Sequence, residues 1–249
     1  MNLENIISVR PKKLIYRDGN KAIKVFDETF SKADILNEAL NQARIEETHL
    51  NIPKIHEITK VDGKWAIISD YIEGKTLESL MQEDTAKLDE YLNLFVNLQI
   101  FVNSQRASLL NKQKDKMLRK ISETSLDETT KYDLQIRLEG MPNHNKVCHG
   151  DFNPSNIIIT PEKKSYILDW SHVTQGNASA DVARTYLLFC LDKKINIADN
   201  YLNLFCKKTG TKKHYVQMWF PIVAASQMVN SKLDEQEFLK HWVHVVDYE

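Results

Sequence analysis

Apolar and polar residues alternate along much of the first 71 residues, a pattern typical of β-strands. Five strands are predicted, at residues 6–9, 14–17, 21–26, 55–59 and 65–71. Asp18-Gly19 separates the second and third strands and Asp62-Gly63 the last two, and both pairs favour hairpin turns. Between the third and fourth predicted strands, Ile35, Ala39 and Ile45 recur at helical spacing, so a helix is expected from residue 32 to about 47. Ser31 is its expected N-cap, with Asp34 at the capping-box position.

Beyond residue 72 the pattern becomes helical, except for a β-hairpin expected at 157–169. Residues 88–107 are broadly apolar and predict a buried helix. Residues 111–139 carry many charges and predict two exposed helices with a break near Ser125. Three or four amphipathic helices are expected from residue 180 onward.

These elements predict an α+β fold of two lobes. Residues 1–72 would form a small N-terminal lobe, with an antiparallel sheet and one helix. Residues 73–249 would form a larger, mainly helical lobe. A chain of 249 residues is long enough for this division, and it contains no repeats or low-complexity segments.

Three polar side chains surround the predicted hairpin: Asp151, Asn156 and Asp169. Asn156 directly precedes its first strand and Asp169 follows the second, so the hairpin brings both to the same end. A carboxylate and an amide oxygen are ligands that suit Mg²⁺. Asp151 lies a short loop away, where it can orient and deprotonate a substrate hydroxyl. The set predicts phosphoryl transfer from ATP.

Each residue also has a structural interpretation. Asp151 could close a turn, Asn156 could be a turn amide, and Asp169 could be a solvated strand end. A zinc site made from His144, Cys148, His149 and Asp151 is a further, weaker alternative. Because Asp151, Asn156 and Asp169 occur together at this spacing, we favour the catalytic interpretation.

The run His149-Gly150-Asp151, with Asn156 and then Asp169, resembles the catalytic and metal loops of the aminoglycoside phosphotransferase and choline kinase superfamily. These are small-molecule kinases with a protein-kinase-like fold. Protein kinases have Arg between His and Asp and follow the metal Asp with Phe-Gly, whereas this chain has Gly150 and Trp170. Together with the absence of a recognisable activation segment, this disfavours a protein kinase.

The resemblance implies further roles. Lys24 would contact the ATP phosphates with Glu38 as its partner, and the backbone of residues 70–72, including Asp70 and Ile72, would contact adenine. Ile23, Ile67, Ile68 and Ile167 are candidate walls of the purine pocket. His149 would hold the loop in shape, and Asp181, supported by Arg184, would brace the loop from beneath.

One segment departs from the family pattern. The loop at 10–13 replaces the expected glycine-rich phosphate loop with Arg10-Pro11-Lys12-Lys13, and Pro11 lacks a backbone N–H. The grip of this loop on ATP is therefore expected to be weak, or another phosphate donor takes the place of ATP. The expected cofactors are ATP, or another nucleoside triphosphate, and Mg²⁺. The alternative function is a kinase-like, nucleotide-binding regulator with little or no transferase activity.

Composition limits the partners. The formal net charge is −1, which gives no reason to expect nucleic acid binding, and no apolar run is long enough to span a membrane. The first residues show no signal-peptide pattern, and the three cysteines are sparse, so we expect a cytoplasmic protein. The expected acceptor is a small hydroxyl compound of aminoglycoside, amino-alcohol or sugar type.

Overall fold

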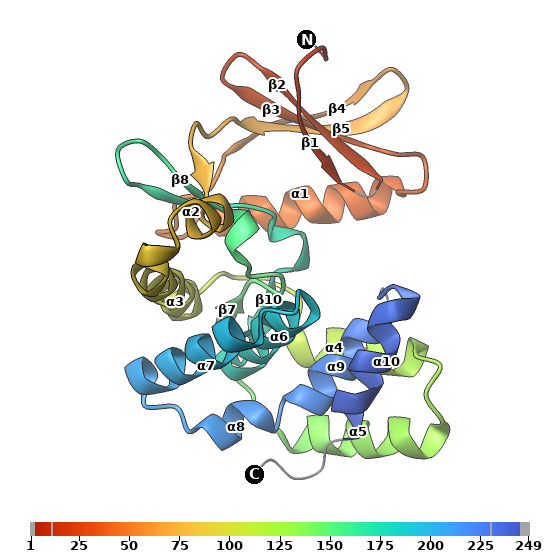
Figure 1. The fold of residues 1–249 in the computed structure, drawn as a ribbon. Helices are drawn as coiled ribbons and strands as arrows, with labels where there is room; N and C mark the ends of the chain where they lie inside the picture. Colours follow the sequence, from red (N-terminus) through yellow and green to blue (C-terminus); the bar gives the residue numbers. More distant parts are fainter. Residues whose placement is uncertain (1–2, 11, 230, 245–249) are drawn as a thin grey trace. The chain divides into compact units, whose positions relative to one another are not determined.

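A computed structural model describes residues 3–10, 12–229 and 231–244 (Figure 1). The chain divides into two compact units, each built from two segments. The first unit contains Met1–Ala86 and Pro154–His172, and the second contains Lys87–Asn153 and Val173–Glu249. These units differ from the lobes at 1–72 and 73–249, which remain a prediction. The α+β class is confirmed by an antiparallel N-terminal sheet and a helical C-terminal region.

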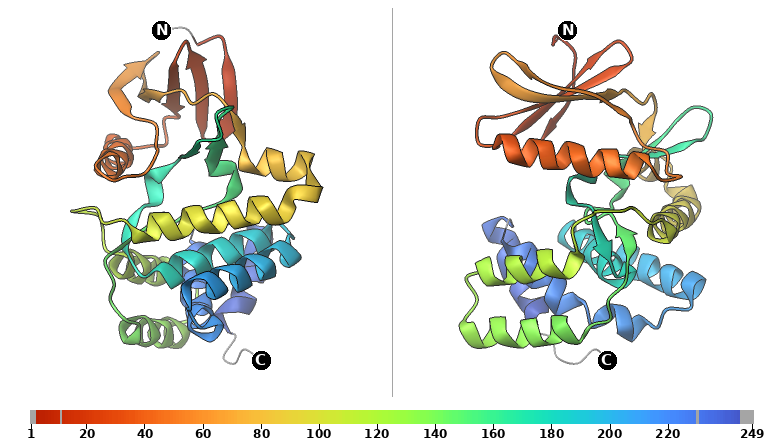
Figure 2. Two further views of the ribbon diagram at one scale, coloured as in Figure 1. Left: turned by 90° about the vertical axis from the view of Figure 1, so that its left-hand side faces the viewer. Right: turned by 180° about the vertical axis from the view of Figure 1, so that it is seen from behind.

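The first unit is built on a five-stranded antiparallel sheet (Figure 2). Its strands are β1 (Ile6–Arg10), β2 (Lys13–Asp18), β3 (Lys21–Phe26), β4 (Ile55–Val61) and β5 (Lys64–Asp70). Their spatial order is β1-β2-β3-β5-β4, so the central strand β3 pairs with β2 and β5. In the register of β3 and β5, Lys24 lies opposite Ile67 and Ile23 opposite Ile68.

Helix α1 (Lys32–Glu46) packs along one face of this sheet (Figure 2). The predicted capping box is present, because Ser31 accepts a hydrogen bond from the Asp34 backbone N–H and Asp34 accepts one from Ser31. Ile35 and Ala39 pack against Phe26 and Ile67 on the sheet. This packing fixes α1 on the face of β3 that carries Lys24, because Lys24 and Ile67 are cross-strand neighbours.

The predicted hairpin at 157–169 is formed by β8 (Ile157–Ile159) and β9 (Ser165–Ile167). The short strand β6 (Lys75–Thr76) extends it to a three-stranded sheet. Gly74 precedes β6 with φ of +158°, and a Cβ there would lie 2.3 Å from the carbonyl oxygen of Ile159. Glycine is therefore required for this close approach. Helix α2 (Leu77–Glu83) and the 3₁₀ turn η1 (Thr85–Lys87) follow.

The second unit contains eight helices among the described residues. They are α3 (Leu88–Ser104), α4 (Gln113–Glu123), α5 (Glu128–Gly140), α6 (Ala178–Leu191), α7 (Ile195–Thr209), α8 (Lys213–Gln217), α9 (Phe220–Met228) and α10 (Leu233–Val243). The break predicted near Ser125 separates α4 from α5. The helix expected to end at 107 ends at Ser104. Five helices, rather than the expected three or four, lie in the described residues beyond 177.

One β-element of the second unit was missed by the sequence analysis. The three-residue strands β7 (Lys146–Cys148) and β10 (Thr174–Gly176) pair antiparallel. Almost everything beyond residue 72 except 157–169 was expected to be helical, and segments this short do not show a recognisable period, so this pair was not found. The pair fixes the chain just before residue 149 and just before α6, where several candidate site residues lie.

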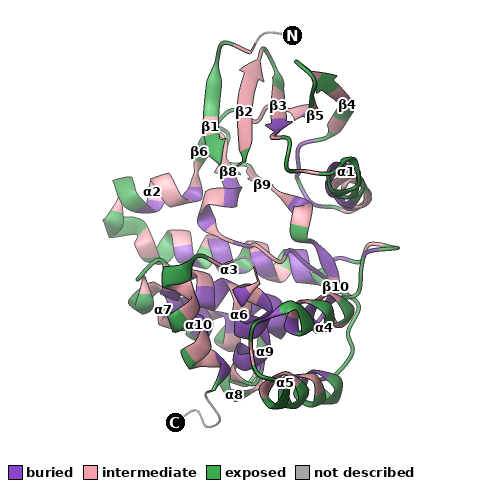
Figure 3. Ribbon diagram, turned by 90° about the vertical axis from the view of Figure 1, so that its right-hand side faces the viewer, coloured by how far each residue is buried: buried purple, intermediate pink, exposed green. Residues whose placement is uncertain are grey.

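An aromatic cluster forms the centre of the second unit. Phe95 on α3 packs against Phe152, Phe189 and Tyr201, with ring centroids 4.8 Å, 5.6 Å and 5.6 Å away. These rings are almost fully buried. Helix α6, which carries Phe189, consists mostly of buried residues (Figure 3). Because Phe152 belongs to the loop after β7, burial of its ring against Phe95 anchors that loop to α3. Thr185 on α6 also donates a hydrogen bond to the Phe152 carbonyl oxygen, at 2.9 Å. No helix in the described parts of the chain combines the length and hydropathy needed to cross a membrane.

Candidate functional site

The loop at 149–153 in the second unit carries the proposed base. Gly150 adopts a left-handed conformation with φ of +79°, which turns the chain sharply between His149 and Asp151. His149 is fully buried, and its Nδ1 accepts a hydrogen bond from the Asp151 backbone N–H at 3.2 Å. This contact fits the predicted role of His149 in shaping the loop.

Asp181 lies beneath this loop on the first turn of α6. Its carboxylate accepts hydrogen bonds from the backbone N–H of Gly150 at 2.7 Å and of His149 at 3.2 Å. Two buried amides, Asn103 and Gln99, also donate to it, at 3.3 Å and 3.5 Å. A buried carboxylate is costly unless its oxygens are satisfied, and these donors satisfy it. Asp181 therefore makes the contacts that the predicted bracing role requires.

Asp151 is half-buried and held from two sides. Arg184, one turn beyond Asp181, donates from Nε to the Gly150 carbonyl oxygen and from Nη2 to Asp151 Oδ1 at 3.4 Å. Asn153 Nδ2 donates to the Asp151 carbonyl oxygen at 3.1 Å and contacts Asp151 Oδ2 at 3.4 Å. These contacts orient the carboxylate, as expected of a group that positions a substrate hydroxyl.

A second group of candidate residues meets in the first unit. Lys24 Nζ lies 2.6 Å from Glu38 Oε1 and 3.4 Å from Asp169 Oδ1. The ammonium of Lys13 binds the other oxygen of Glu38, at 2.9 Å. Burial alone would lower the pKa of Lys24, but the carboxylates of Asp169 and Glu38 raise it above its ordinary value. Lys24 therefore stays cationic over the whole physiological pH range.

Asp169 has an unusual backbone for a non-glycine residue, with φ of +60°. Its Oδ1 accepts a hydrogen bond from Ser171 Oγ at 2.9 Å. Burial would raise the pKa of Asp169, but the ammonium groups of Lys24 and Lys13 hold that pKa well below its usual range. The side chain is therefore an ionised oxygen donor at neutral pH.

The hairpin brings Asn156 and Asp169 to the same end of its two strands, as predicted. Ile157 pairs with Ile167, and the Leu168 backbone N–H donates to the Asn156 carbonyl oxygen at 2.8 Å. Asn156 is buried and Asp169 is ionised, and one amide plus one carboxylate is a donor set that fits Mg²⁺ when phosphate oxygens and water complete the shell. Within residues 3–10, 12–229 and 231–244, no three His, Cys, Asp or Glu side chains gather as a metal site.

Asp70 is the last residue of β5, which pairs with β3, and Ile72 lies two residues beyond that strand. The Asp70 carboxylate accepts a hydrogen bond from the Lys54 backbone N–H at 2.9 Å and lies 2.7 Å from His56 Nε2. Both carboxylate oxygens of Asp70 therefore contact partners within the first unit. The adenine contacts expected from the backbone of residues 70–72 remain a prediction.

Two of the four isoleucines proposed to line a purine pocket lie on the wrong face of the sheet. Ile23 and Ile68 pack with Val25 and Ala66 in a separate core cluster. Side chains alternate between faces along a strand, so Ile23 points away from the face that carries Lys24. Ile67 is on the Lys24 face but is packed under α1.

The 10–13 loop contains no glycine and so differs from the glycine-rich phosphate loop of the family. Lys12 has φ of +63°, Pro11 lies outside the described residues, and Lys13 is turned toward Glu38. A small cavity of about 170 Å³ is lined by residues that include Arg10, Lys12 and Lys64.

The sequence analysis missed several residues of these two groups. Lys13 could have been found, because it lies two residues before Ile15, the cross-strand partner of Lys24, and therefore on the same face. Gln99 and Asn103 are amides four residues apart in α3, but the exposed residues Asn93 and Asn97 have the same spacing, so the sequence alone did not single out the buried pair.

Residues 13–216 match the model of the phosphotransferase enzyme family, and the chain belongs to that family. A comparison with curated protein sequences gives no match.

Solved structures share the fold at low sequence identity. A thermostable mutant of aminoglycoside phosphotransferase APH(4)-Ia has a TM-score of 0.70 at 14% identity, covering 95% of this chain and 91% of that one. The choline kinase LicA from Streptococcus pneumoniae has a TM-score of 0.67 at 14% identity, covering 98% of this chain and 92% of that one. A choline/ethanolamine kinase family protein from Mesorhizobium loti has a TM-score of 0.63 at 11% identity, covering 98% and 89%.

Proposed function

We propose that this chain is an ATP-dependent phosphotransferase that moves the γ-phosphate to a hydroxyl group of a small molecule. The observation that carries the proposal is the way Asp151 is held, by Arg184 and Asn153 on a loop braced by Asp181. A turn-closing aspartate has no need of this support. The structural relatives support a nucleotide substrate, because they include complexes with ADP and hygromycin B, with AMP-PNP, and with AMP.

In the proposed reaction, the acceptor oxygen forms a bond to the γ-phosphorus of ATP, and the bond from that phosphorus to the β–γ bridging oxygen breaks. The electron pair of the broken bond leaves with ADP, and the hydroxyl proton moves to the Asp151 carboxylate. Lys24, held by Glu38, binds the phosphates of the nucleotide. Asn156 and Asp169 would hold Mg²⁺, which neutralises negative charge on the phosphates when it is bound.

The proposal includes a reducing compartment such as the cytoplasm, which suits the free cysteines Cys148, Cys190 and Cys206. The alternative is a nucleotide-binding regulator, and the glycine-free 10–13 loop is the feature that favours it. Mg²⁺-dependent release of ADP with a panel of aminoglycosides, amino-alcohols and sugars separates the two. Nucleotide binding without transfer to any acceptor would favour the regulator.

The Asp151→Asn variant gives the sharpest test of the proposed base. We expect turnover to fall about 10²–10⁴-fold, because the amide cannot accept the hydroxyl proton, while ADP affinity stays unchanged. Single-turnover transfer and isothermal titration with Mg·ADP measure the two quantities. Asp192→Asn, at the other end of α6, is a matched control. Unchanged turnover in Asp151→Asn would remove Asp151 from the mechanism.

A further inference from the structure

A cavity of about 580 Å³ lies within the second unit, where the ends of three helices meet. Its walls come from the end of α3, the start of α6 and the end of α7, together with the 144–146 segment and the 211–215 segment at the start of α8. None of the described residues that line this cavity, which we call the α6 cavity, belongs to the 149–153 loop. Its volume is in the range of known sites for small ligands.

The charged side chains around the α6 cavity are all basic. The described residues that line it include Arg106, Lys146, Lys212 and His144, but no Asp or Glu. The whole chain, by contrast, has 34 acidic and 33 basic residues, without counting histidine. None of these four side chains forms an ion pair with a described residue, and Arg106 donates only to the Asn145 carbonyl oxygen, at 3.1 Å. The cavity therefore carries positive charge that no nearby carboxylate balances.

Two hydroxyl groups at the α6 cavity are able to donate hydrogen bonds to a ligand. Tyr215 accepts a hydrogen bond from Asn177 Nδ2 at 2.6 Å, which leaves its own O–H proton available. Ser179, in the first turn of α6, is only 4% exposed, and its hydroxyl has no hydrogen-bond partner among the described residues. Buried hydroxyl groups nearly always have a partner, so the Ser179 hydroxyl is a donor that a ligand can use.

Asn103 lines the same cavity and has an acceptor atom that the described residues do not use. Its Nδ2 donates to the Val147 carbonyl oxygen at 2.9 Å and to Asp181 Oδ2 at 3.3 Å. Because both partners are acceptors, they fix the orientation of the amide and keep its Oδ1 directed away from them. A donor such as a ligand hydroxyl would remove the cost of leaving the buried Oδ1 unpaired.

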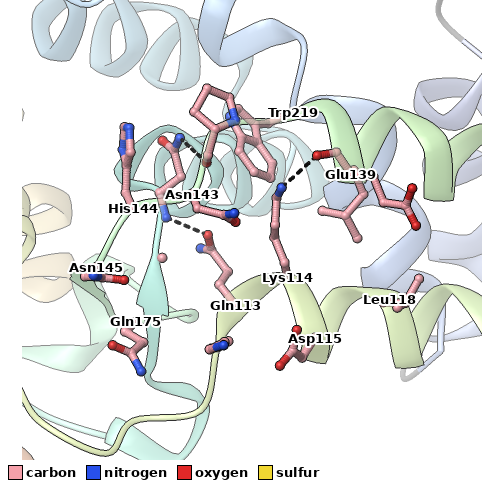
Figure 4. Close-up of a pocket in the computed structure, with 15 residues that line it drawn as sticks. Gln113, Lys114, Asp115, Leu118, Glu139, Asn143, His144, Asn145, Gln175 and Trp219 are labelled. Carbon is pink, nitrogen blue, oxygen red and sulfur yellow. Dashed lines mark hydrogen bonds between the residues drawn. The ribbon is translucent and has the colours of Figure 1, made fainter.

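A neighbouring cavity of about 480 Å³ has a different balance of charge (Figure 4). It shares His144 with the α6 cavity, but Asp115 and Glu139 accompany the two lysines that line it. One of these lysines, Lys114, points toward α5 and donates to the Glu139 carbonyl oxygen at 3.1 Å. The unbalanced positive charge is therefore a property of the α6 cavity and not of this whole face of the second unit.

We infer that the α6 cavity binds a small organic anion that carries a hydroxyl group beside its phosphate or carboxylate. Lys146 and Lys212 bind the anionic group, together with the Ser179 hydroxyl at the N-terminal end of α6, where the helix dipole also favours negative charge. Asn103 Oδ1 accepts a hydrogen bond from the ligand hydroxyl. The inference does not depend on the proposed function, because the 149–153 loop takes no part in it. Phosphate and carboxylate share this chemistry, and the experiment distinguishes them.

The first arm of the test measures the affinity of the full chain for glycerol 3-phosphate by isothermal titration without nucleotide. The Lys146→Gln/Lys212→Gln variant should raise the dissociation constant at least about tenfold, because two charge-assisted contacts are lost. Lys207→Gln/Lys208→Gln is the matched control. It removes the same charge from the exposed last turn of α7, outside the cavity, and should change the constant less than about twofold. An equal effect of the two double variants, or no effect of either, would overturn the inference.

Ser179→Ala tests the buried donor without changing any charge. We expect it to weaken glycerol 3-phosphate about threefold to tenfold, because one hydrogen bond to the anion is lost. The melting temperature of the free variant shows that the fold is kept. An unchanged dissociation constant in a folded Ser179→Ala variant would overturn the assignment of Ser179.

The second arm compares ligands that differ in one feature at a time. Glycerol 3-phosphate is paired with methyl phosphate and glycerate with propionate, and the hydroxylated member of each pair should bind at least about threefold more tightly. Equal affinity within both pairs would overturn the role of Asn103. Preference between glycerol 3-phosphate and glycerate identifies the anionic group, whereas glycerol that binds as tightly as either would overturn the charge argument.

A last variant separates this cavity from the nucleotide residues of the first unit. Lys24→Met should leave the affinity for glycerol 3-phosphate unchanged, since Lys24 does not line the α6 cavity. Binding that is lost in Lys24→Met but kept in Lys146→Gln/Lys212→Gln would place the anion at the nucleotide residues and overturn the inference.

Discussion

The carboxylate of Asp181 binds two successive backbone N–H groups of the 149–153 loop, and this is a demanding arrangement for one side chain. It converts a short loop with a left-handed glycine into a fixed support for Asp151. Charge-assisted hydrogen bonds of this kind are stronger than neutral ones, especially where water is excluded. Asp181 is therefore a positioning residue whose loss should affect both stability and turnover.

Asp181→Asn tests this at the residue scale. The amide can replace only one of the carboxylate oxygens as an acceptor, so an N–H of the loop is left facing an NH₂ group. We expect the free energy of unfolding to fall by about 2–4 kcal/mol, because buried hydrogen-bonded carboxylates are costly to disrupt. Urea unfolding measures this. Asp192→Asn at the exposed end of α6 should change it by less than about 0.5 kcal/mol. An unchanged stability in Asp181→Asn would mean that the loop is held by other contacts.

Sequence reasoning anticipated much of the candidate site, because its parts lie in short motifs with characteristic spacing. Asp151, Asn156 and Asp169 were chosen from such spacing, and the expected pair of Lys24 and Glu38 forms an ion pair at 2.6 Å. Lys13 was missed, since its partner is 25 residues away in the chain and only strand register brings the two together. The partial burial of Lys116 and Lys120 was missed for another reason: the many charges in residues 111–139 were interpreted as a sign that both helices are exposed.

At the scale of elements, helix α4 has a buried face, and the partly buried lysines Lys116 and Lys120 lie along the edge of that face. Burying an ammonium group disfavours its charged form, so these lysines reduce stability wherever they must be protonated.

The pH dependence of stability follows from Lys116. Its pKa is about 7 in the folded chain and near 10.5 when unfolded, so between these values the unfolded state binds more protons. The free energy of unfolding should therefore rise as the pH increases from about 7 to 10. Lys116→Met should weaken this rise and stabilise the protein by about 1–2 kcal/mol near pH 7, since a pKa unit corresponds to about 1.4 kcal/mol and partial exposure screens the effect.

Urea unfolding at several pH values between 6.5 and 9.5 measures this effect, with Lys112→Met as the control on the same helix. The difference between wild type and variant isolates Lys116 from other titrating groups. A parallel pH profile in the two proteins would show that Lys116 keeps its ordinary pKa.

Long elements were easier to predict than short ones. The five strands of the large sheet and the capped helix α1 carry clear periodic or capping signals, and all of them are present. The strands β6, β7 and β10 have only two or three residues each, so they depend on tertiary pairing rather than on local pattern. The helices after residue 177 were undercounted because the short α8 lies close to its neighbours in the chain.

At the scale of the whole molecule, each compact unit is made of two separate stretches of chain. The 154–172 segment belongs with residues 1–86, and β6 pairs with β8 within that unit. Segments of one cooperative unit should open together. We therefore expect amide hydrogen exchange in β8 and β9 to follow that of the large sheet rather than that of the adjacent 149–153 loop.

Gly74→Ala provides a perturbation confined to the first unit. The added Cβ would collide with the Ile159 carbonyl, so the pairing of β6 and β8 should weaken and exchange in residues 157–167 should rise. Exchange in α6 should stay unchanged. Gly140→Ala in the second unit, where a Cβ meets nothing within 4 Å, is the matched control. Equal acceleration in α6 would show that the whole chain unfolds as one unit.

The order of these segments along the chain also determines the order in which they leave the ribosome. The large sheet and α1 emerge first, but the hairpin that completes their unit is synthesised only after α3, α4 and α5. During that interval the edge of β6 has no strand to pair with, and exposed edges of this kind favour association with other chains. The nascent protein must therefore keep its earliest segment soluble while residues 77–156, about a third of its length, are translated, and slow codons or chaperones acting before residue 157 would have their greatest influence there.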